Sequence, residues 1–433
     1  MSASAIYKLV SRPSPFGNES GQLANGEFAP SGEENMIKLN AAKVLVVGAG
    51  GLGCEVLKDL ALSGFRDIHV IDMDTIDVTN LNRQFLFRMG DVGKSKAQCA
   101  ADFVMRRVPG CQVTSHTCKV QDKEPDFYQQ FKIVIAGLDN IEARRWLNNM
   151  LTSFVEIDDD GEFSGVIIPM IDGGTEGFKG QARVILPRIT SCYECSISTF
   201  AAATGFAMCT VASTPRIPEH CIAWAMMIAW DKERPGAKIN KDSPEDMKWL
   251  YEKALVRAAE FDIKGVTYFL TMGVVKNIIP AVASTNAIVS AACVNEAFKF
   301  STFASQSLNT WYMYMGSNSV FTDTFEYAKH AECIVCGDTS KPRPRSVPRD
   351  STVQQFLDSL IDDKFLQLKA PSATAIHGQQ SLTLYMRAPR SLEEQTRPNL
   401  ARPLADFVGQ GGEVTVTDKL LEGVAVIFKI HFE

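Results

Sequence analysis

A glycine-rich turn between an aliphatic run and a helical pattern constrains this sequence more than any other feature. Residues 44–47 are continuously aliphatic, GAGGLG occupies 48–53, apolar residues then recur at near-helical spacing, and a second apolar run ends at Asp72. This order of strand, turn, helix and strand brings backbone N–H groups to a phosphate and an acidic side chain to a ribose hydroxyl. The pattern predicts nucleotide binding by Gly48, Gly50, Gly51, Gly53 and Asp72.

Strands and helices continue to alternate along the chain. The spacing predicts a helix over 95–107, strands over 112–117 and 133–136, and a helix from Ile141. This alternation indicates an α/β fold built on a largely parallel sheet. Residues 1–42 lack sustained periodicity, so we expect an arm that becomes ordered only against another surface.

Changes in composition predict further parts. Beyond Cys192 the chain turns to Ala, Met and Trp at helical spacing, which predicts a helical insertion over 196–269 within a sheet domain made of 43–195 and 270–336. The proline-rich stretch 337–350 predicts a linker without regular structure. The last 83 or so residues combine one helical pattern with alternating strands, and we expect a small mixed domain there.

Composition and charge exclude several classes of function. Of the 433 residues, 45% are hydrophobic and 22% are charged, which is typical of a globular protein rather than a disordered one. The net charge of −6 provides no general attraction to nucleic acid or to an anionic membrane. Because no signal-peptide pattern or long apolar run is present, we expect a cytoplasmic and nuclear protein without a membrane partner.

Polar residues beyond the glycine turn favour a triphosphate over a nicotinamide cofactor. Their side chains place amide and cationic groups where a triphosphate needs neutralising. These residues are Asn80, Arg83, Gln84 and Lys96. Asp139, which follows the strand at 133–136, could hold Mg²⁺ between phosphate oxygens, although it or Asn140 could also cap the next helix.

At these residues the chain resembles the ubiquitin-activating enzyme superfamily, whose bacterial members MoeB and ThiF adenylate the C-terminal glycine of a small sulfur-carrier protein. The resemblance covers nearly the whole chain from Lys43. It implies a Rossmann-like adenylation domain that uses ATP and Mg²⁺. It further implies that Asp72 and Asp74 face the ribose and nucleotide, and that Asp139 handles the magnesium ion.

Two CxxC motifs predict a structural zinc site. Cys192 and Cys195 form one pair, and Cys333 and Cys336 form the other. This spacing lets two thiolates from one turn share a tetrahedral metal, and the two pairs flank the predicted insertion. Chance or a redox role could explain one such motif, but both together indicate zinc, and the superfamily places zinc in the same way.

Cys209 lies in the segment GFAMCTVASTPRIPEHC, which is rich in turn residues and small residues. Spacing alone favours a packing role for this thiol and makes Cys221 an equal candidate. However, MCTVAS and PRIPEHC resemble the catalytic-cysteine segment of heterodimeric activating enzymes, most closely the catalytic subunits for the Nedd-type (Rub-type) modifier. The resemblance implies that Cys209 is the thioester nucleophile. It also implies that Arg183, in DGGTEGFKGQARVILP, helps to reject ubiquitin, whose tail carries an arginine.

The resemblance implies a complete reaction. ATP-dependent adenylation of the modifier is followed by a thioester on Cys209 and by transfer to a cysteine of a conjugating enzyme. Residues 351–433 resemble the ubiquitin-fold (β-grasp) domain that recruits this enzyme, and the single glycine turn implies a second subunit. Alternatives are a subunit that activates the Sumo modifier, an NAD(P)-dependent oxidoreductase, or a zinc-stabilised scaffold without activity.

Overall fold

The chain divides into two units. The computed structural model describes residues 3–12, 29–157, 162–199, 208–240, 243–275, 281–305, 307–308, 311–337, 342–377, 380–421 and 424–433. One unit spans residues 1–198 and 281–433, and the other spans residues 199–280. The second unit contains most of the predicted insertion, 196–269, and ends further along the chain than predicted.

A parallel sheet with an antiparallel extension forms the centre of the first unit. Its parallel strands are β1 (Lys43–Val47), β2 (Asp67–Ile71), β3 (Gln112–His116), β4 (Ile133–Ala136) and β7 (Met170–Glu176). Its antiparallel strands are β8 (Lys179–Ile185), β9 (Trp311–Met315) and β10 (Phe321–Phe325). The strand order is β10, β9, β8, β7, β4, β1, β2, β3. The predicted α/β class is confirmed, whereas sequence periodicity did not indicate the hairpin of β9 and β10.

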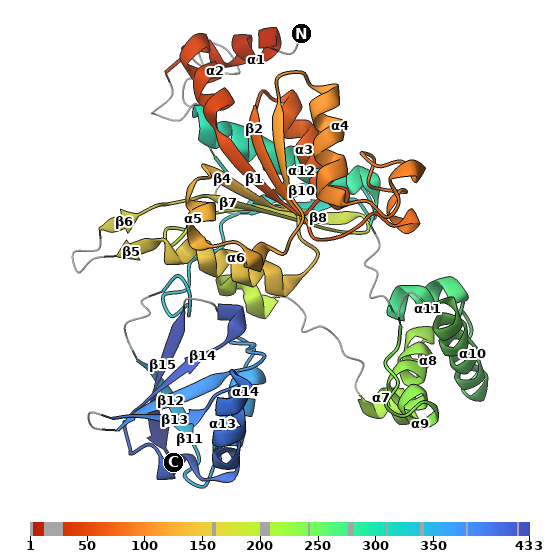
Figure 1. Cartoon of the computed structure of the whole chain (residues 1–433), viewed down its shortest axis with the longest axis vertical. Coiled ribbons are helices and arrows are strands. Elements are labelled where there is room, and N and C mark those ends of the chain that lie inside the picture. The colour runs from red at the N-terminus through yellow and green to blue at the C-terminus, as the bar shows by residue number, and fades with distance from the viewer. Residues whose placement is uncertain are drawn as a thin grey trace. The chain divides into compact units, whose positions relative to one another are not determined.

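Helices cover both faces of this sheet (Figure 1). One face carries α3 (Gly51–Leu62), α4 (Lys96–Arg107) and α12 (Ala283–Thr302). The other face carries α5 (Pro125–Gln129) and α6 (Ile141–Ser153). A two-stranded ribbon of β5 (Val155–Ile157) and β6 (Phe163–Gly165) follows α6.

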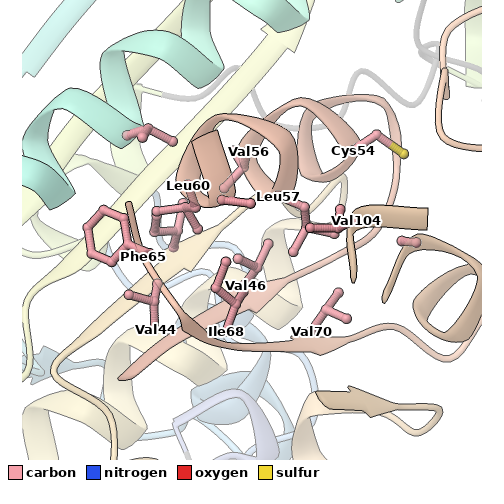
Figure 2. Packing of buried hydrophobic residues seen from close by; sticks show 14 of the residues in the cluster. Val44, Val46, Cys54, Val56, Leu57, Leu60, Phe65, Ile68, Val70 and Val104 are labelled. Carbon is pink, nitrogen blue, oxygen red and sulfur yellow. The ribbon is translucent and has the colours of Figure 1, made fainter. Parts of the chain in front are cut away.

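The main core lies between the strands and α3 (Figure 2). Val44 and Val46 are two residues apart on β1, so their side chains point to the same face of the sheet, where Leu57 and Leu60 of α3 are also buried. Burying each such side chain contributes about 1.5–3 kcal/mol. Cys54 belongs to this core, and burial raises the pKa of its thiol, as expected for a packing residue.

Part of the N-terminal arm is ordered against its own chain, which corrects our expectation for residues 1–42. It forms α1 (Ala3–Val10) and α2 (Gly32–Ala41). The side chain of Asn35 is buried and donates to the carbonyls of Val10 and Ala29, and Leu39 is part of the main core. Because polar and apolar residues share the buried face of α2, the helix has no apolar periodicity that could have predicted it.

The C-terminal module is a mixed sheet with two helices. Its strands are β11 (Arg343–Val347), β12 (Ser372–His377), β13 (Gln380–Tyr385), β14 (Glu413–Thr417) and β15 (Ala425–Phe432), and its helices are α13 (Val353–Ile361) and α14 (Arg390–Thr396). The sheet order is β11, β15, β14, β12, β13. The expectation of an irregular linker over 337–350 is therefore wrong for β11. Pro344 fits there because β11 is an edge strand, where a missing N–H is tolerated.

The second unit is helical, as predicted. Its helices are α7 (Met208–Ser213), α8 (Pro218–Trp224), α9 (Trp230–Glu233), α10 (Pro244–Glu260) and α11 (Tyr268–Val275), with a π-helical turn over Ala225–Ala229. Its own hydrophobic core includes Ile222, Trp230, Leu250 and Ala254. Among the helices in the described part of the chain, we find no candidate for a membrane-spanning segment.

Candidate functional site

The glycine turn joins the carboxyl end of β1 to the start of α3. Gly48 has a φ of +97°, and a Cβ atom there would lie 2.7 Å from the carbonyl oxygen of Gly137. A Cβ atom on Gly53 would lie 1.9 Å from the carbonyl oxygen of Gly48. Only glycine permits this conformation and these close approaches. The turn thus lies directly against the loop that follows β4.

Asp72 holds the glycine turn in place. Its carboxylate accepts hydrogen bonds from the backbone N–H groups of Ala49, at 2.6 Å, and Asp74, at 2.8 Å. Burial raises the pKa of Asp72, and these two hydrogen bonds oppose the increase. Gly50 occupies the N-cap position of α3 without a side-chain cap, so backbone N–H groups remain at this helix terminus for an anion.

Most of the predicted nucleotide contacts lie on the segment between β2 and α4. Lys96 is 8% exposed, and its Nζ atom lies 2.8 Å from Asp74 Oδ2. Asn80 accepts a hydrogen bond from the N–H of Asp77, and Arg83 donates to the carbonyl of Thr79. Local contacts thus orient these side chains, and the structure brings Asp74 and Lys96 together.

Gln84 points towards the glycine turn. Its side chain is 3% exposed, and its Nε2 atom lies 3.9 Å from the position of a Cβ atom built on Gly50. Its Oε1 atom is buried without a hydrogen-bond partner in the described part of the chain. A buried unpaired carbonyl oxygen costs about 1–3 kcal/mol, so this atom is suited to accept a hydrogen bond from a bound molecule.

Asp139 follows β4 and is exposed, in the loop that contacts the glycine turn. Its neighbour Asn140 is the N-cap of α6, since the Asn140 side chain accepts hydrogen bonds from the N–H groups of Glu142 and Ala143. The carboxylate of Asp139 is therefore not the helix cap. Its type and position fit an oxygen ligand for Mg²⁺ beside a phosphate.

A buried cluster of charges that the sequence did not reveal lies at β7 and β8. Asp172 is 0% exposed and pairs with Arg144, at 2.8 Å, and with Arg183, at 3.1 Å. Burial opposes ionisation of Asp172, but the two guanidinium groups hold the pKa of its carboxyl below its usual range. The two arginines come from α6 and β8, so only the tertiary fold brings the three residues together.

Arg183, predicted to help reject ubiquitin, is itself buried. Its guanidinium lies 4.3 Å from the ring centre of Tyr193 and 4.6 Å from that of Trp311, and it donates to Ser196 Oγ at 2.7 Å. Aromatic faces and a carboxylate together form a strong site for a guanidinium. The role of Arg183 in selectivity stays a prediction, and any such role would operate from within this cluster.

The four predicted metal ligands meet in one buried cluster. Cys192 Sγ lies 3.5 Å from Cys333 Sγ, and Cys195 Sγ lies 3.4 Å from Cys336 Sγ. All four sulfur atoms lie within 4.8 Å of one another. Tetrahedral zinc with Zn–S bonds of about 2.3 Å needs sulfur atoms about 3.8 Å apart. The donor set and its dimensions therefore fit a zinc ion.

The two candidate nucleophiles occupy neighbouring helices. Cys209 belongs to α7, and its side chain lies outside the described residues. Cys221 lies on α8 and is 0% exposed, and burial raises the pKa of its thiol. Because the thiolate is the reactive form, Cys221 is poorly suited to nucleophilic attack.

Comparisons with known proteins match most of the chain. The ThiF family model matches residues 22–335, and the E2 binding domain model matches residues 346–432. The chain is 49% identical to the NEDD8-activating enzyme E1 catalytic subunit of Dictyostelium discoideum, over 99% of this chain and 96% of that protein. It is 48% identical to that of Drosophila melanogaster, over 92% of this chain and 89% of that protein. Similarity to SUMO-activating enzyme subunit 2 of Dictyostelium discoideum, at 44% identity, covers 46% of this chain and 28% of that protein.

Proposed function

Because the chain belongs to the ThiF family and to the NEDD8-activating enzyme E1 catalytic subunits, we propose that it uses ATP to activate a Nedd-type modifier for conjugation. The observation that carries this proposal is the extent of the match. It includes the nucleotide-binding sheet, the cysteine-bearing helical unit and the E2 binding domain in one chain. The Sumo alternative is weaker, since that similarity covers less than half of the chain.

Adenylation is the first step. The C-terminal carboxylate of the modifier attacks the α-phosphorus of ATP, pyrophosphate leaves, and an acyl adenylate forms. The N–H groups at the start of α3 bind phosphate, and Lys96 and Arg83 stabilise the negative charge that develops. Asp72 keeps the turn in shape, and Gln84 offers its unpaired oxygen to the nucleotide.

Metal ions would assist both the chemistry and the fold. Mg²⁺, held by Asp139, supplies charge neutralisation at the phosphates when bound. Zn²⁺, held by Cys192, Cys195, Cys333 and Cys336, would tie the chain on both sides of the helical unit to one place. The fit of the four sulfur positions supports the zinc assignment.

Thioester formation and transfer complete the reaction. The thiolate of Cys209 attacks the acyl adenylate, the bond to AMP breaks, and the modifier remains on the sulfur atom. The acyl group then passes to a cysteine of a conjugating enzyme, which the module at 346–432 would recruit. A second subunit completes the activating enzyme. Cytoplasmic and nuclear location stays a prediction from the sequence.

The test separates adenylation from thioester formation. With its partner subunit and modifier, the protein is expected to exchange pyrophosphate into ATP and to form a modifier adduct that a reducing agent cleaves. Cys209→Ala keeps the exchange and loses the adduct, because adenylation precedes any need for the thiol. Asp139→Ala lowers both activities by about tenfold or more, since the negative charge of the phosphates is then less well neutralised. The matched control, Cys221→Ala, keeps both.

Two outcomes would contradict the proposal. If the heterodimer without substitutions shows no modifier-dependent exchange of pyrophosphate into ATP, the proposed adenylation step is wrong. An adduct that persists in Cys209→Ala, or is lost only in Cys221→Ala, would move the nucleophile to another residue.

A further inference from the structure

A buried asparagine on α12 faces the glycine turn. The helix α12 packs beside α3 (Figure 1), and Asn286 lies at the end of its first turn. Asn286 is 2% exposed. A Cβ atom built on Gly51, the first residue of α3, would overlap the Nδ2 atom of Asn286. The amide nitrogen therefore lies beside the N-terminus of the helix to which we assign phosphate binding.

Thr175, on β7, sets the orientation of this amide. Its Oγ1 atom donates to Asn286 Oδ1 at 2.6 Å. The neighbouring Thr285 donates to the carbonyl of Gly177 at 2.9 Å, which holds the first turn of α12 against the connection between β7 and β8. Because Thr175 binds the oxygen of the amide, the N–H2 group is directed at Gly51. Among the described residues, none accepts a hydrogen bond from this N–H2 group.

The groups around this amide are suited to an anion. The N–H groups of the first residues of α3 have no acceptor within the helix, and no side chain caps them. The side chain of Arg83 also passes beside Gly51, with its Cγ atom 3.5 Å from the position of a Cβ atom built there. Backbone N–H groups, a guanidinium and a carboxamide N–H2 are all hydrogen-bond donors. Donors gathered at a helix N-terminus favour a phosphate group.

We propose that Asn286 is a further nucleotide-binding residue, whose N–H2 group donates to a phosphate oxygen of ATP at the glycine turn. This inference rests on the proposed function, since it requires that the turn binds ATP. It also explains why residue 51 is a glycine, because any side chain there would occupy the space of the amide. The part of the first unit that follows the helical unit thus supplies a donor to the nucleotide site.

The experiment measures binding of ATP and of adenosine to the full heterodimer in the absence of modifier. Adenosine lacks phosphates, so its affinity does not depend on the proposed contact. Asn286→Ala removes the amide, whereas Asn286→Asp keeps its shape and an oxygen for Thr175 and replaces the N–H2 group by a carboxylate oxygen. Ser290→Ala is the matched control. Ser290 lies one turn later on α12, is 0% exposed and donates to Asp59 of α3 at 2.8 Å, away from the glycine turn.

Asn286→Ala is expected to raise the Kd for ATP by about tenfold, the loss that one hydrogen bond to a charged group explains. Asn286→Asp is expected to raise the Kd for ATP by at least as much, because a carboxylate repels phosphate. The Kd for adenosine stays unchanged in both variants. Ser290→Ala keeps the original Kd values for ATP and for adenosine.

Several results would overturn the inference. An unchanged Kd for ATP in Asn286→Ala and Asn286→Asp would show that the amide does not contact the nucleotide. Equal losses of affinity for ATP and adenosine would mean that Asn286 only packs against the turn, and an equal loss in Ser290→Ala would assign the effect to the packing of α12 on α3. If the heterodimer without substitutions does not bind ATP, the proposed function is wrong instead, so the two failures are distinguishable.

Discussion

At the scale of single residues, buried charges are compensated by specific partners. Asp172 is neutralised by Arg144 and Arg183, which come from different elements. Removing one partner from a buried pair costs about 3–5 kcal/mol when a charge is left alone. With two guanidinium groups present, Asp172 keeps one partner when the other is changed. Arg183 can therefore be substituted without leaving the carboxylate unpaired.

Arg183→Gln is expected to let the enzyme adenylate ubiquitin more readily and to preserve use of the native modifier. The resemblance to activating enzymes implies that this guanidinium opposes an arginine of the ubiquitin tail, and like charges brought together disfavour the wrong partner. Pyrophosphate exchange dependent on ubiquitin measures the effect, with an expected gain of about tenfold. Arg183→Lys keeps the positive charge and should still reject ubiquitin. If ubiquitin-dependent exchange does not increase in Arg183→Gln, Arg183 acts only as a structural counter-ion of Asp172.

At the scale of elements, the paired CxxC motifs connect segments that are distant in the sequence. Cys192 and Cys195 precede the helical unit, and Cys333 and Cys336 follow it. The four thiols are buried, so deprotonating them requires a metal ion to balance their charge.

Cys333→Ser is expected to lose the metal and to destabilise the first unit by about 3 kcal/mol, since loss of a metal ligand is among the costly single changes. Metal analysis should find about one zinc per chain in the unmodified protein. Cys99→Ser changes a half-buried cysteine on α4 and serves as the control. Folded protein without zinc, or a Cys333→Ser protein with unchanged metal content and stability, would contradict the site.

A histidine pair joins β2 to β3 and predicts a dependence on pH. His69 Nδ1 lies 3.0 Å from His116 Nε2, and both rings pack on phenylalanines. Burial lowers the pKa of His116 from 6.5 to about 4, and Lys123 and His69 add to the decrease. Burial also lowers the pKa of His69, against the influence of Asp67. These two histidines therefore bind protons at a lower pH in the folded chain than in the unfolded chain.

The free energy of unfolding is not reduced by this pair above about pH 6.5, where both histidines are neutral in either state. It decreases as the pH falls towards about 4, because the unfolded chain then binds more protons than the folded chain does. The free energy of unfolding in urea, measured at pH 7 and pH 5, should fall less in His116→Gln than in the unmodified protein. His431→Gln, which changes a residue outside this pair, should keep the original difference. Equal differences in all three proteins would mean that the pair does not couple folding to pH.

At the scale of the whole molecule, α6 connects the sheet to the C-terminal module. Arg145 is 2% exposed and forms a bidentate pair with Glu194, at 2.7 and 3.0 Å. Its remaining N–H groups donate to the carbonyls of Leu366 and Gln367. Glu194 lies between two of the candidate zinc ligands, so one arginine connects the metal cluster to the module. No spacing in the sequence predicts this contact.

Sequence patterns predicted the features that depend on neighbouring residues. The glycine turn, Asp72, the alternating strands and helices and the CxxC pairs are local patterns, and each is found where predicted. Such patterns are readable because backbone geometry and ligand spacing limit which residues fit. The resemblance to activating enzymes rested on the same local motifs.

Other features depend on contacts between segments that are distant in the sequence. The helix α2 and the strand β11 exist because distant parts of the chain satisfy their buried polar groups and complete their sheet. The cluster around Asp172 and the contact of Asn286 with Gly51 likewise join elements that are far apart in sequence. A buried charge or a short helix is stable only when such partners are present, and their identity depends on which surfaces the folded chain brings together.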